Sequence, residues 1–192
     1  MITPKQFADS SHSYIEAPAG CGKTELICNA VNEASGCQLV LTHTHAGIHA
    51  IRARMKSLGV SSRKYHLETI AGWALKIGFS YPQTCGINQA DDRYNFSKSY
   101  PAACVFLSTL AGRRILVSSY SGVFVDEYQD CSKSQHQLIL ILSETLPVRL
   151  VGDPLQQIYT FDKTDYFIEI GNNGESADTT DQCPRYADDQ TL

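Results

Sequence analysis

Short apolar stretches alternate along the chain with longer segments whose apolar residues recur at a helical period. Four of these stretches have the length and the aliphatic and aromatic content of buried strands in a parallel sheet. They lie at residues 13–17, 38–42, 122–127 and 148–153. The pattern therefore predicts a central parallel sheet.

Helical periodicity is clearest in residues 46–57, where Ile48, Ile51 and Met55 share one face and the basic side chains lie elsewhere. The other segments predicted as helices are residues 23–34, 69–77 and 134–145. Since strands and helices alternate, we expect an α/β fold whose parallel sheet is flanked by helices through right-handed crossovers.

Two regions interrupt this alternation. Residues 78–121 begin with a polar stretch rich in turn residues, and a helix is predicted only later, in "AACVFLSTLAGRR". We interpret 78–121 as a small, mainly helical insertion between the core segments 1–77 and 122–161. Residues 162–192 are polar and poor in aliphatic side chains, which predicts a tail or the start of a further domain.

The composition narrows the class of protein. The chain has 192 residues, of which 43% are hydrophobic and 19% are charged, as in an ordinary domain with a buried core. The net charge of -4 gives no general attraction to nucleic acid, so such a contact requires a local patch. The seven cysteines include no CxxC pair and no zinc-type spacing.

The N-terminus is polar and no apolar run approaches the roughly 18 residues of a membrane span, so we expect a cytoplasmic protein without membrane contact.

The segment "EAPAGCGKTEL", residues 16–26, follows a predicted strand and precedes a predicted helix. Such a loop presents backbone N–H groups to phosphate oxygens, and Gly20 and Gly22 allow the tight turn that this requires. Lys23 would reach the β- and γ-phosphates, and Thr24 would hold Mg²⁺. The alternative is an ordinary glycine turn, which the flanking strand and helix make the weaker interpretation. The residues expected to contact the nucleotide here are Ala19, Gly20, Cys21, Gly22, Lys23, Thr24 and Glu25.

The stretch "VFVDEYQD" supplies the acidic half of such a site. Its apolar residues form a strand that delivers Asp126 and Glu127 at its carboxyl end, where ligands bind in sheets of this kind. Asp126 is expected to hold Mg²⁺, directly or through water, and Glu127 to deprotonate the attacking water.

Together, "APAGCGKT", "DEYQD" and "VGDPLQQIY" resemble motifs I, II and III of the UvrD/Rep-like superfamily 1 DNA helicases. The segments "LTHTHAGIHAIRARM" and "HLETIAGWALK" resemble motifs Ia and Ib, and the resemblance extends over residues 4–161. It implies a RecA-like P-loop NTPase domain, the first motor half of an enzyme that hydrolyses ATP with Mg²⁺.

The resemblance also implies residue roles. Gln156 would sense the γ-phosphate and act in catalysis, Gln129 would assist its coupling to DNA, and Gln6 would read the adenine. The residues implied to lie along single-stranded DNA are Thr42, His43, Thr44, His45, Thr69, Tyr159 and Phe161. The last two offer rings on which unstacked bases can lie.

The expected function is therefore that of the ATP-hydrolysing N-terminal part of a DNA helicase or translocase. Family members carry a second RecA-like domain that supplies arginines to the γ-phosphate, so we expect this chain alone to hydrolyse ATP slowly and not to unwind DNA. Members act in DNA repair and in antiviral nuclease–helicase systems, so a nuclease or another subunit is a candidate partner. The alternatives are a nucleotide-gated protein-interaction module and a small-molecule P-loop kinase, the latter disfavoured by "GDPLQQIY".

Overall fold

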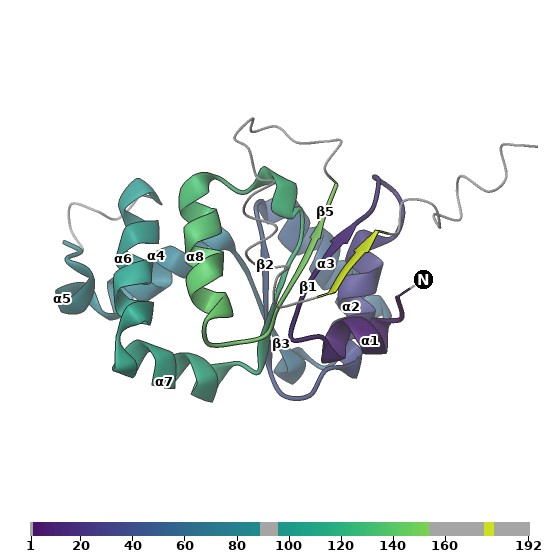
Figure 1. Ribbon diagram of the computed structural model, residues 1–192, viewed down its shortest axis with the longest axis horizontal. Helices are drawn as coiled ribbons and strands as arrows, with labels where there is room; N and C mark the ends of the chain where they lie inside the picture. Colours follow the sequence, from purple (N-terminus) through teal and green to yellow (C-terminus); the bar gives the residue numbers. More distant parts are fainter. Residues whose placement is uncertain (1, 89–95, 154–174, 179–192) are drawn as a thin grey trace, which may run out of the picture.

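A computed structural model describes residues 2–88, 96–153 and 175–178 of the chain. Six parallel strands form one sheet in the order β3-β2-β4-β5-β1-β6 (Figure 1). The strands are β1 (His12–Glu16), β2 (Gln38–Thr42), β3 (Tyr65–Thr69), β4 (Gly122–Val125), β5 (Val148–Gly152) and β6 (Glu175–Asp178).

Helices cover both faces of the sheet and form three layers with it (Figure 1). One face is covered by α1 (Pro4–Asp9), α2 (Lys23–Glu33) and α3 (His45–Ser57). The other is covered by α4 (Ile70–Ser80), α6 (Phe96–Ser108), α7 (Leu110–Ser119) and α8 (Lys133–Ser143). The short elements are α5 (Pro82–Cys85), η1 (Ser62–Lys64) and η2 (Tyr128–Asp130).

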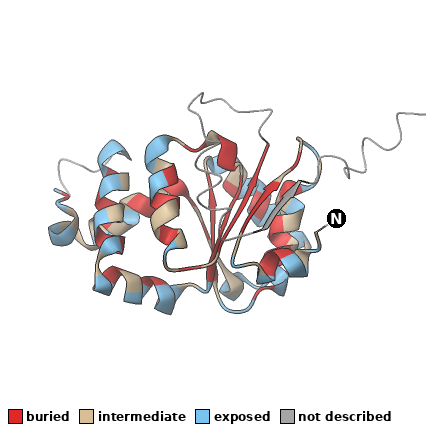
Figure 2. Cartoon of the chain, in the orientation of Figure 1, coloured by how far each residue is buried: buried red, intermediate tan, exposed pale blue. Residues whose placement is uncertain are grey.

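Alternation of side chains along the strands divides the core into two apolar clusters. On β4, Val123 and Val125 belong to the cluster under α4, α6 and α8, whereas Phe124 belongs to the cluster under α1, α2 and α3. All four residues of β4 are buried, as are all five of β2, so the middle of the sheet is covered on both faces (Figure 2). The predicted RecA-like α/β class, with its central parallel sheet, is confirmed.

Three elements differ from the expectation. β3 is not predicted because it is an edge strand of the described sheet, where its Tyr65, His66 and Glu68 are only partly buried and interrupt the apolar pattern. α1 is only six residues long and is marked by its capping box rather than by periodicity. β6 falls within the predicted tail and pairs with β1 through backbone hydrogen bonds, which a polar sequence can also form.

The predicted insertion is helical but does not contain the single helix expected there. α6 ends at Ser108 and α7 begins after Thr109, whose hydroxyl accepts a hydrogen bond from Gly112 N. A Cβ at Gly112 would lie 2.1 Å from Phe106 O, so this glycine permits the close turn between the helices. Within the described residues no single helix has the length and apolarity to cross a membrane; α6 and α7 meet that test only as a pair bent by 94°.

Candidate nucleotide-binding site

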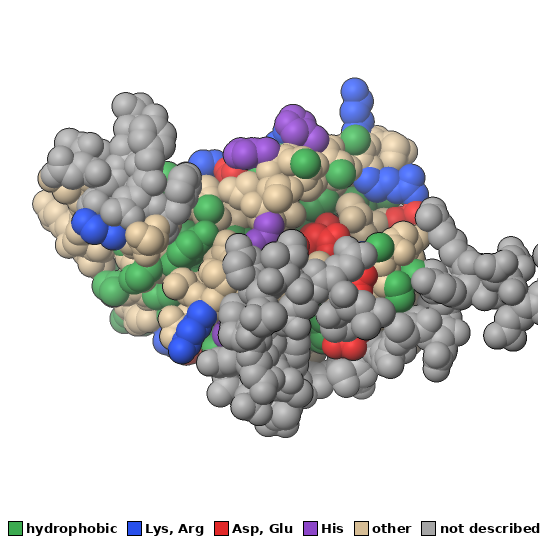
Figure 3. Space-filling view, turned by 90° about the horizontal axis from the view of Figure 1, so that it is seen from above, with side chains coloured by type: hydrophobic (Ala, Val, Ile, Leu, Met, Phe, Trp, Pro, Cys, Tyr) green, Lys and Arg blue, Asp and Glu red, His purple; other side chains and the backbone are tan. Residues whose placement is uncertain are grey.

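The candidate site lies at the carboxyl edge of the sheet, above three adjacent strands. β4, β5 and β1 are consecutive in the sheet, so the loop after β1 and the chain that follows β4 reach the same edge on either side of β5. Figure 3 views this edge from above and shows acidic side chains near its centre. Sheet order thus brings together segments that are about 100 residues apart in the chain, as the contact between Thr24 and Asp126 shows.

The loop after β1 has the backbone of a phosphate-binding turn. Gly20 and Gly22 both have φ of 79°, a left-handed conformation that glycine adopts without steric cost. Gly22 is the N-cap of α2 and provides no capping side chain, so the first N–H groups of the helix stay open to an anion. Ala17, which replaces the first glycine of the usual pattern, still donates its N–H to Gly152 O at 3.0 Å. It continues the strand pairing, and no glycine is required there.

Lys23 is directed inward from the first turn of α2. Its side chain is 7% exposed, and Nζ donates to Ala17 O at 3.0 Å and lies 3.9 Å from Asp153 Oδ2. Asp153 follows β5 and is itself 2% exposed. The ammonium group is therefore held between the loop and the end of β5, where it can exchange these oxygens for those of a phosphate.

Thr24 and Asp126 join the loop to the acidic strand end. Thr24 Oγ1 donates to Asp126 Oδ2 at 3.2 Å. Burial raises the pKa of Asp126 to about 6, and the neighbouring charge of Glu127 adds to this rise, while the hydrogen bonds from Thr24 and Glu127 N and the charge of Lys23 oppose it. The Thr24 hydroxyl and the Asp126 carboxylate thus lie side by side, and oxygens of these two kinds are suitable ligands for Mg²⁺. No cluster of three or more His, Cys, Asp or Glu suited to a metal occurs in the described part of the chain.

Glu127 has an uncommon backbone conformation. Its φ of 53° makes it the one left-handed non-glycine residue among those described. Its N–H donates to Asp126 Oδ1 at 3.1 Å, and its Oε2 accepts a hydrogen bond of 2.7 Å from Gln129 Nε2. Gln129 Oε1 in turn accepts from Asp153 N at 2.9 Å. Local sequence patterns do not predict these contacts of Gln129 and Asp153, although the family resemblance assigned Gln129 a role in coupling to DNA.

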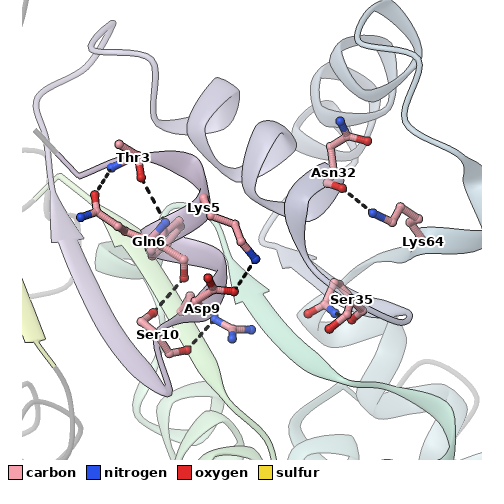
Figure 4. Close-up of polar contacts among 11 residues, drawn as sticks. Thr3, Lys5, Gln6, Asp9, Ser10, Asn32, Ser35 and Lys64 are labelled. Atoms are coloured by element: carbon pink, nitrogen blue, oxygen red, sulfur yellow. Dashed lines mark hydrogen bonds and ion pairs between the residues drawn. The ribbon is translucent and has the colours of Figure 1, made fainter.

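Two residues expected to contact the nucleotide have other partners. Gln6 is exposed and forms a capping box with Thr3 at the start of α1, with hydrogen bonds of 2.9 and 3.2 Å (Figure 4). Glu25 is exposed and forms an ion pair with Arg54 on α3. Thr3 followed three residues later by glutamine is the signal in the sequence that could have identified the first of these.

The residues expected along DNA differ in accessibility. Thr44 and His45 are exposed at the start of α3, and His43 is half-buried with Nε2 3.4 Å from Cys131 Sγ. Thr42 is only 2% exposed and Thr69 only 6%, and the Thr69 hydroxyl caps α4, so neither is a free surface group. Gln156, Tyr159 and Phe161 lie outside the described residues.

The sheet order and the site at its carboxyl edge define a RecA-like α/β domain. Comparison with known proteins identifies its relatives: the family model of the UvrD/REP helicase N-terminal domain matches residues 105–170. The Gabija protein GajB of Bacillus cereus (strain VD045) is 26% identical in an alignment of 193 positions that covers 79% of this chain. F-box DNA helicase 1 of Gallus gallus is 51% identical over 45 residues, which cover 23% of this chain. The predicted resemblance to UvrD/Rep-like helicases is confirmed. The chain spans 38% of the length of the first relative and 4% of the second.

Solved structures give the same fold. The arterivirus nonstructural protein 10 helicase matches with a TM-score of 0.50 at 16% identity, covering 92% of this chain and 36% of that one. The complex of that helicase with DNA matches with the same TM-score and identity. At this identity the match establishes the architecture only.

Proposed function

We propose that this chain is the ATP-binding and ATP-hydrolysing N-terminal part of a UvrD-like helicase or translocase acting on single-stranded DNA. The observation that carries the proposal is the hydrogen bond between Thr24 and Asp126, which joins a glycine turn at a helix N-terminus to an acidic strand end. A phosphate-binding loop beside a magnesium-binding carboxylate is the minimum arrangement for a bound nucleoside triphosphate.

In this proposal each side chain has a defined task. Backbone N–H groups at Gly22 and at the start of α2 bind phosphate oxygens, and Lys23 leaves Ala17 O and Asp153 to meet the β- and γ-phosphates. Thr24 and Asp126 hold Mg²⁺, which would neutralise phosphate charge. Glu127 accepts the proton of the attacking water.

An exposed row of basic and histidine side chains on α3 supports a nucleic-acid partner. His45, His49, Arg52 and Lys56 recur at the spacing of one helical face, and all four are exposed. None of the four is in an ion pair with a described residue, whereas Arg54 on the same helix pairs with Glu25. Figure 3 shows histidine and Lys or Arg side chains together on one part of this face. The row supplies the local patch that a chain of net charge -4 requires.

We propose that further groups complete the site. In this proposal a second RecA-like domain, or another protein such as a nuclease subunit, supplies cations to the γ-phosphate; arginine fingers of this kind are worth about 10³–10⁵ in rate. In the same proposal, DNA is unwound only when this second domain or subunit has completed the site.

The test is ATP hydrolysis with and without single-stranded DNA. The expected result is Mg²⁺-dependent hydrolysis whose rate rises when a DNA oligonucleotide is added. ATP binding that DNA leaves unchanged, without turnover, would favour the nucleotide-gated interaction module instead. A phosphorylated metabolite as product would favour a small-molecule kinase.

A further inference from the structure

Both ends of the side-chain amide of Gln129 are hydrogen-bonded, and they contact the ends of two different strands. Gln129 lies in η2 and is 2% exposed. Nε2 donates to Glu127 Oε2 at 2.7 Å, just after β4, and Oε1 accepts from Asp153 N at 2.9 Å, just after β5. The amide therefore connects the proposed general base to the residue that also contacts Lys23.

The link through Gln129 lies just beyond the last backbone pair between β4 and β5. The register of β4 with β5 runs from Val123 opposite Val148 to Val125 opposite Leu150. Beyond that pair the described chain has no ladder between the two strands, and Gln129 supplies the next link. Gly152 provides the space, because a Cβ at that position would lie 3.0 Å from Gln129 Oε1.

The chemistry of the two partners fixes the orientation of the amide. The Glu127 carboxylate accepts hydrogen bonds only, and Asp153 N–H donates only, so the reversed amide would place oxygen against oxygen and nitrogen against nitrogen. A hydrogen bond to an ionised carboxylate is also stronger than one between neutral groups. The pair of contacts is therefore specific for a side chain with one donor and one acceptor.

Glu127 requires such support because its backbone is left-handed, with φ of 53°. A non-glycine residue persists in this region only where surrounding contacts hold it there. The hydrogen bonds from Glu127 N to Asp126 Oδ1 and from Gln129 to the carboxylate are those contacts.

We propose that Gln129 is a positioning residue that fastens the Glu127 carboxylate to the end of β5. The inference rests on the proposed function, in which Glu127 is the general base. Asp153 Oδ2 also lies 3.9 Å from Lys23 Nζ, so the base keeps its place relative to this lysine until the lysine moves to the phosphates.

Two substitutions separate the two contacts. Gln129→Glu keeps an acceptor for Asp153 N–H but replaces the donor to Glu127 by a second carboxylate. Gln129→Met keeps the length of the side chain and removes both contacts. Gln135→Glu is the matched control, because Gln135 on α8 also donates through Nε2, to Tyr100 at 2.9 Å, but lies away from the site.

Steady-state hydrolysis of ATP and binding of a non-hydrolysable ATP analogue are measured for all four proteins. We expect kcat to fall at least about tenfold in both Gln129 variants, as for a misplaced base, with KM and the analogue Kd within about threefold of the parent value. The control should keep the parent kcat. Parent kcat in both Gln129 variants, or a loss of analogue binding that matches the loss of kcat, would overturn the proposal.

Amide hydrogen exchange and the HN–Hα coupling of Glu127 distinguish failure of this inference from failure of the proposed function. We expect exchange at Asp153 N to quicken about fivefold in Gln129→Met but to stay slow in Gln129→Glu, with the Glu127 coupling altered in both. If the parent chain hydrolyses no ATP, the proposed function fails. The exchange at Asp153 N and the Glu127 coupling then show by themselves whether Gln129 holds Glu127 in place. Parent-like exchange and coupling in both variants would show that Gln129 does not hold Glu127.

Discussion

At the scale of single residues, Asp126 is a carboxyl group with 3% exposure, and its two oxygens accept hydrogen bonds from Thr24 and from Glu127 N. Burial raises its pKa from 3.8 to about 6, so the folded protein favours the neutral form. The stability that this preference contributes is complete below the ordinary pKa of 3.8 and is lost as pH rises through about 6. A bound cation would relieve the cost of the buried charge above that pH.

The substitution Asp126→Asn replaces this group by a neutral amide of similar shape. A pKa raised from 3.8 to about 6 corresponds to about 3 kcal/mol. The unfolding free energy of the variant minus that of the parent should therefore increase by about 2–3 kcal/mol as the pH is raised from 4 to 8. Urea unfolding without nucleotide or Mg²⁺ measures this, with the exposed Glu33→Gln as the control. A difference between parent and variant that stays constant with pH would contradict the assignment.

Glu127→Gln tests the proposed base without removing its shape. We expect the variant to bind ATP and Mg²⁺ as the parent does and to lose about 10²–10⁴ in hydrolysis rate, because an amide accepts no proton from water at neutral pH. Single-turnover hydrolysis together with a binding titration measures both quantities. Normal turnover in this variant would remove Glu127 from the proposed role.

At the scale of elements, α3 combines two faces with different tasks. Ile48, Ile51 and Met55 pack in the core, whereas the opposite face carries the exposed row formed by His45, His49, Arg52 and Lys56. Thr44 caps the helix and lies at the carboxyl end of β2, so the row begins at the edge of the sheet that holds the candidate site. The cationic members of the row, Arg52 and Lys56, lie in the second half of the helix.

The double variant Arg52→Ala, Lys56→Ala tests this row. Each lost phosphate contact lowers the slope of log Kobs against log salt by about 0.7 for single-stranded DNA. We therefore expect a slope smaller by about 1.4 and weaker binding at low salt, measured by fluorescence anisotropy. Arg113→Ala on α7, where Arg113 pairs with Glu144, is the matched control. An unchanged slope in the double variant would exclude these two side chains from the DNA contact.

Local signals explain which elements could be predicted. α3 and α8 have clear apolar periodicity and capping residues, and both begin within a residue of the expected position. The break between α6 and α7 depends on Thr109 and on the closeness of Gly112 to Phe106 O, and that distance exists only in the folded chain. β3 depends on pairing with β2, which offsets its weak apolar pattern.

At the scale of the whole molecule, the sheet order β4-β5-β1 assembles the site from segments that the chain separates. The glycine turn and the acidic strand end were each predictable, because each is a contiguous pattern. The contacts of Gln129 with Asp153 and of Lys23 with Asp153 were not, since they depend on where β5 lies between β4 and β1.

Nucleotide binding should stabilise the entire fold by mass action. ATP·Mg²⁺ at about 100 times its Kd adds about 2.7 kcal/mol to the unfolding free energy of a protein that binds it only when folded. Lys23→Ala should abolish this gain, and Lys76→Ala, which removes an exposed lysine paired with Glu68, should retain it. Thermal denaturation with and without nucleotide measures both. Equal stabilisation of the parent and Lys23→Ala would refute the role of the loop.

α6 shares its apolar interior with α8 and the sheet. Phe106 and Leu107 of α6 pack in the same cluster as Leu138 and Leu142 of α8 and Val125 of β4. Excision of residues 78–121 would therefore expose an apolar flank of the sheet that carries the candidate site and promote aggregation of the shortened protein. For the same reason, any tilt of β4, the strand that leads to Glu127, would move these helices together with it.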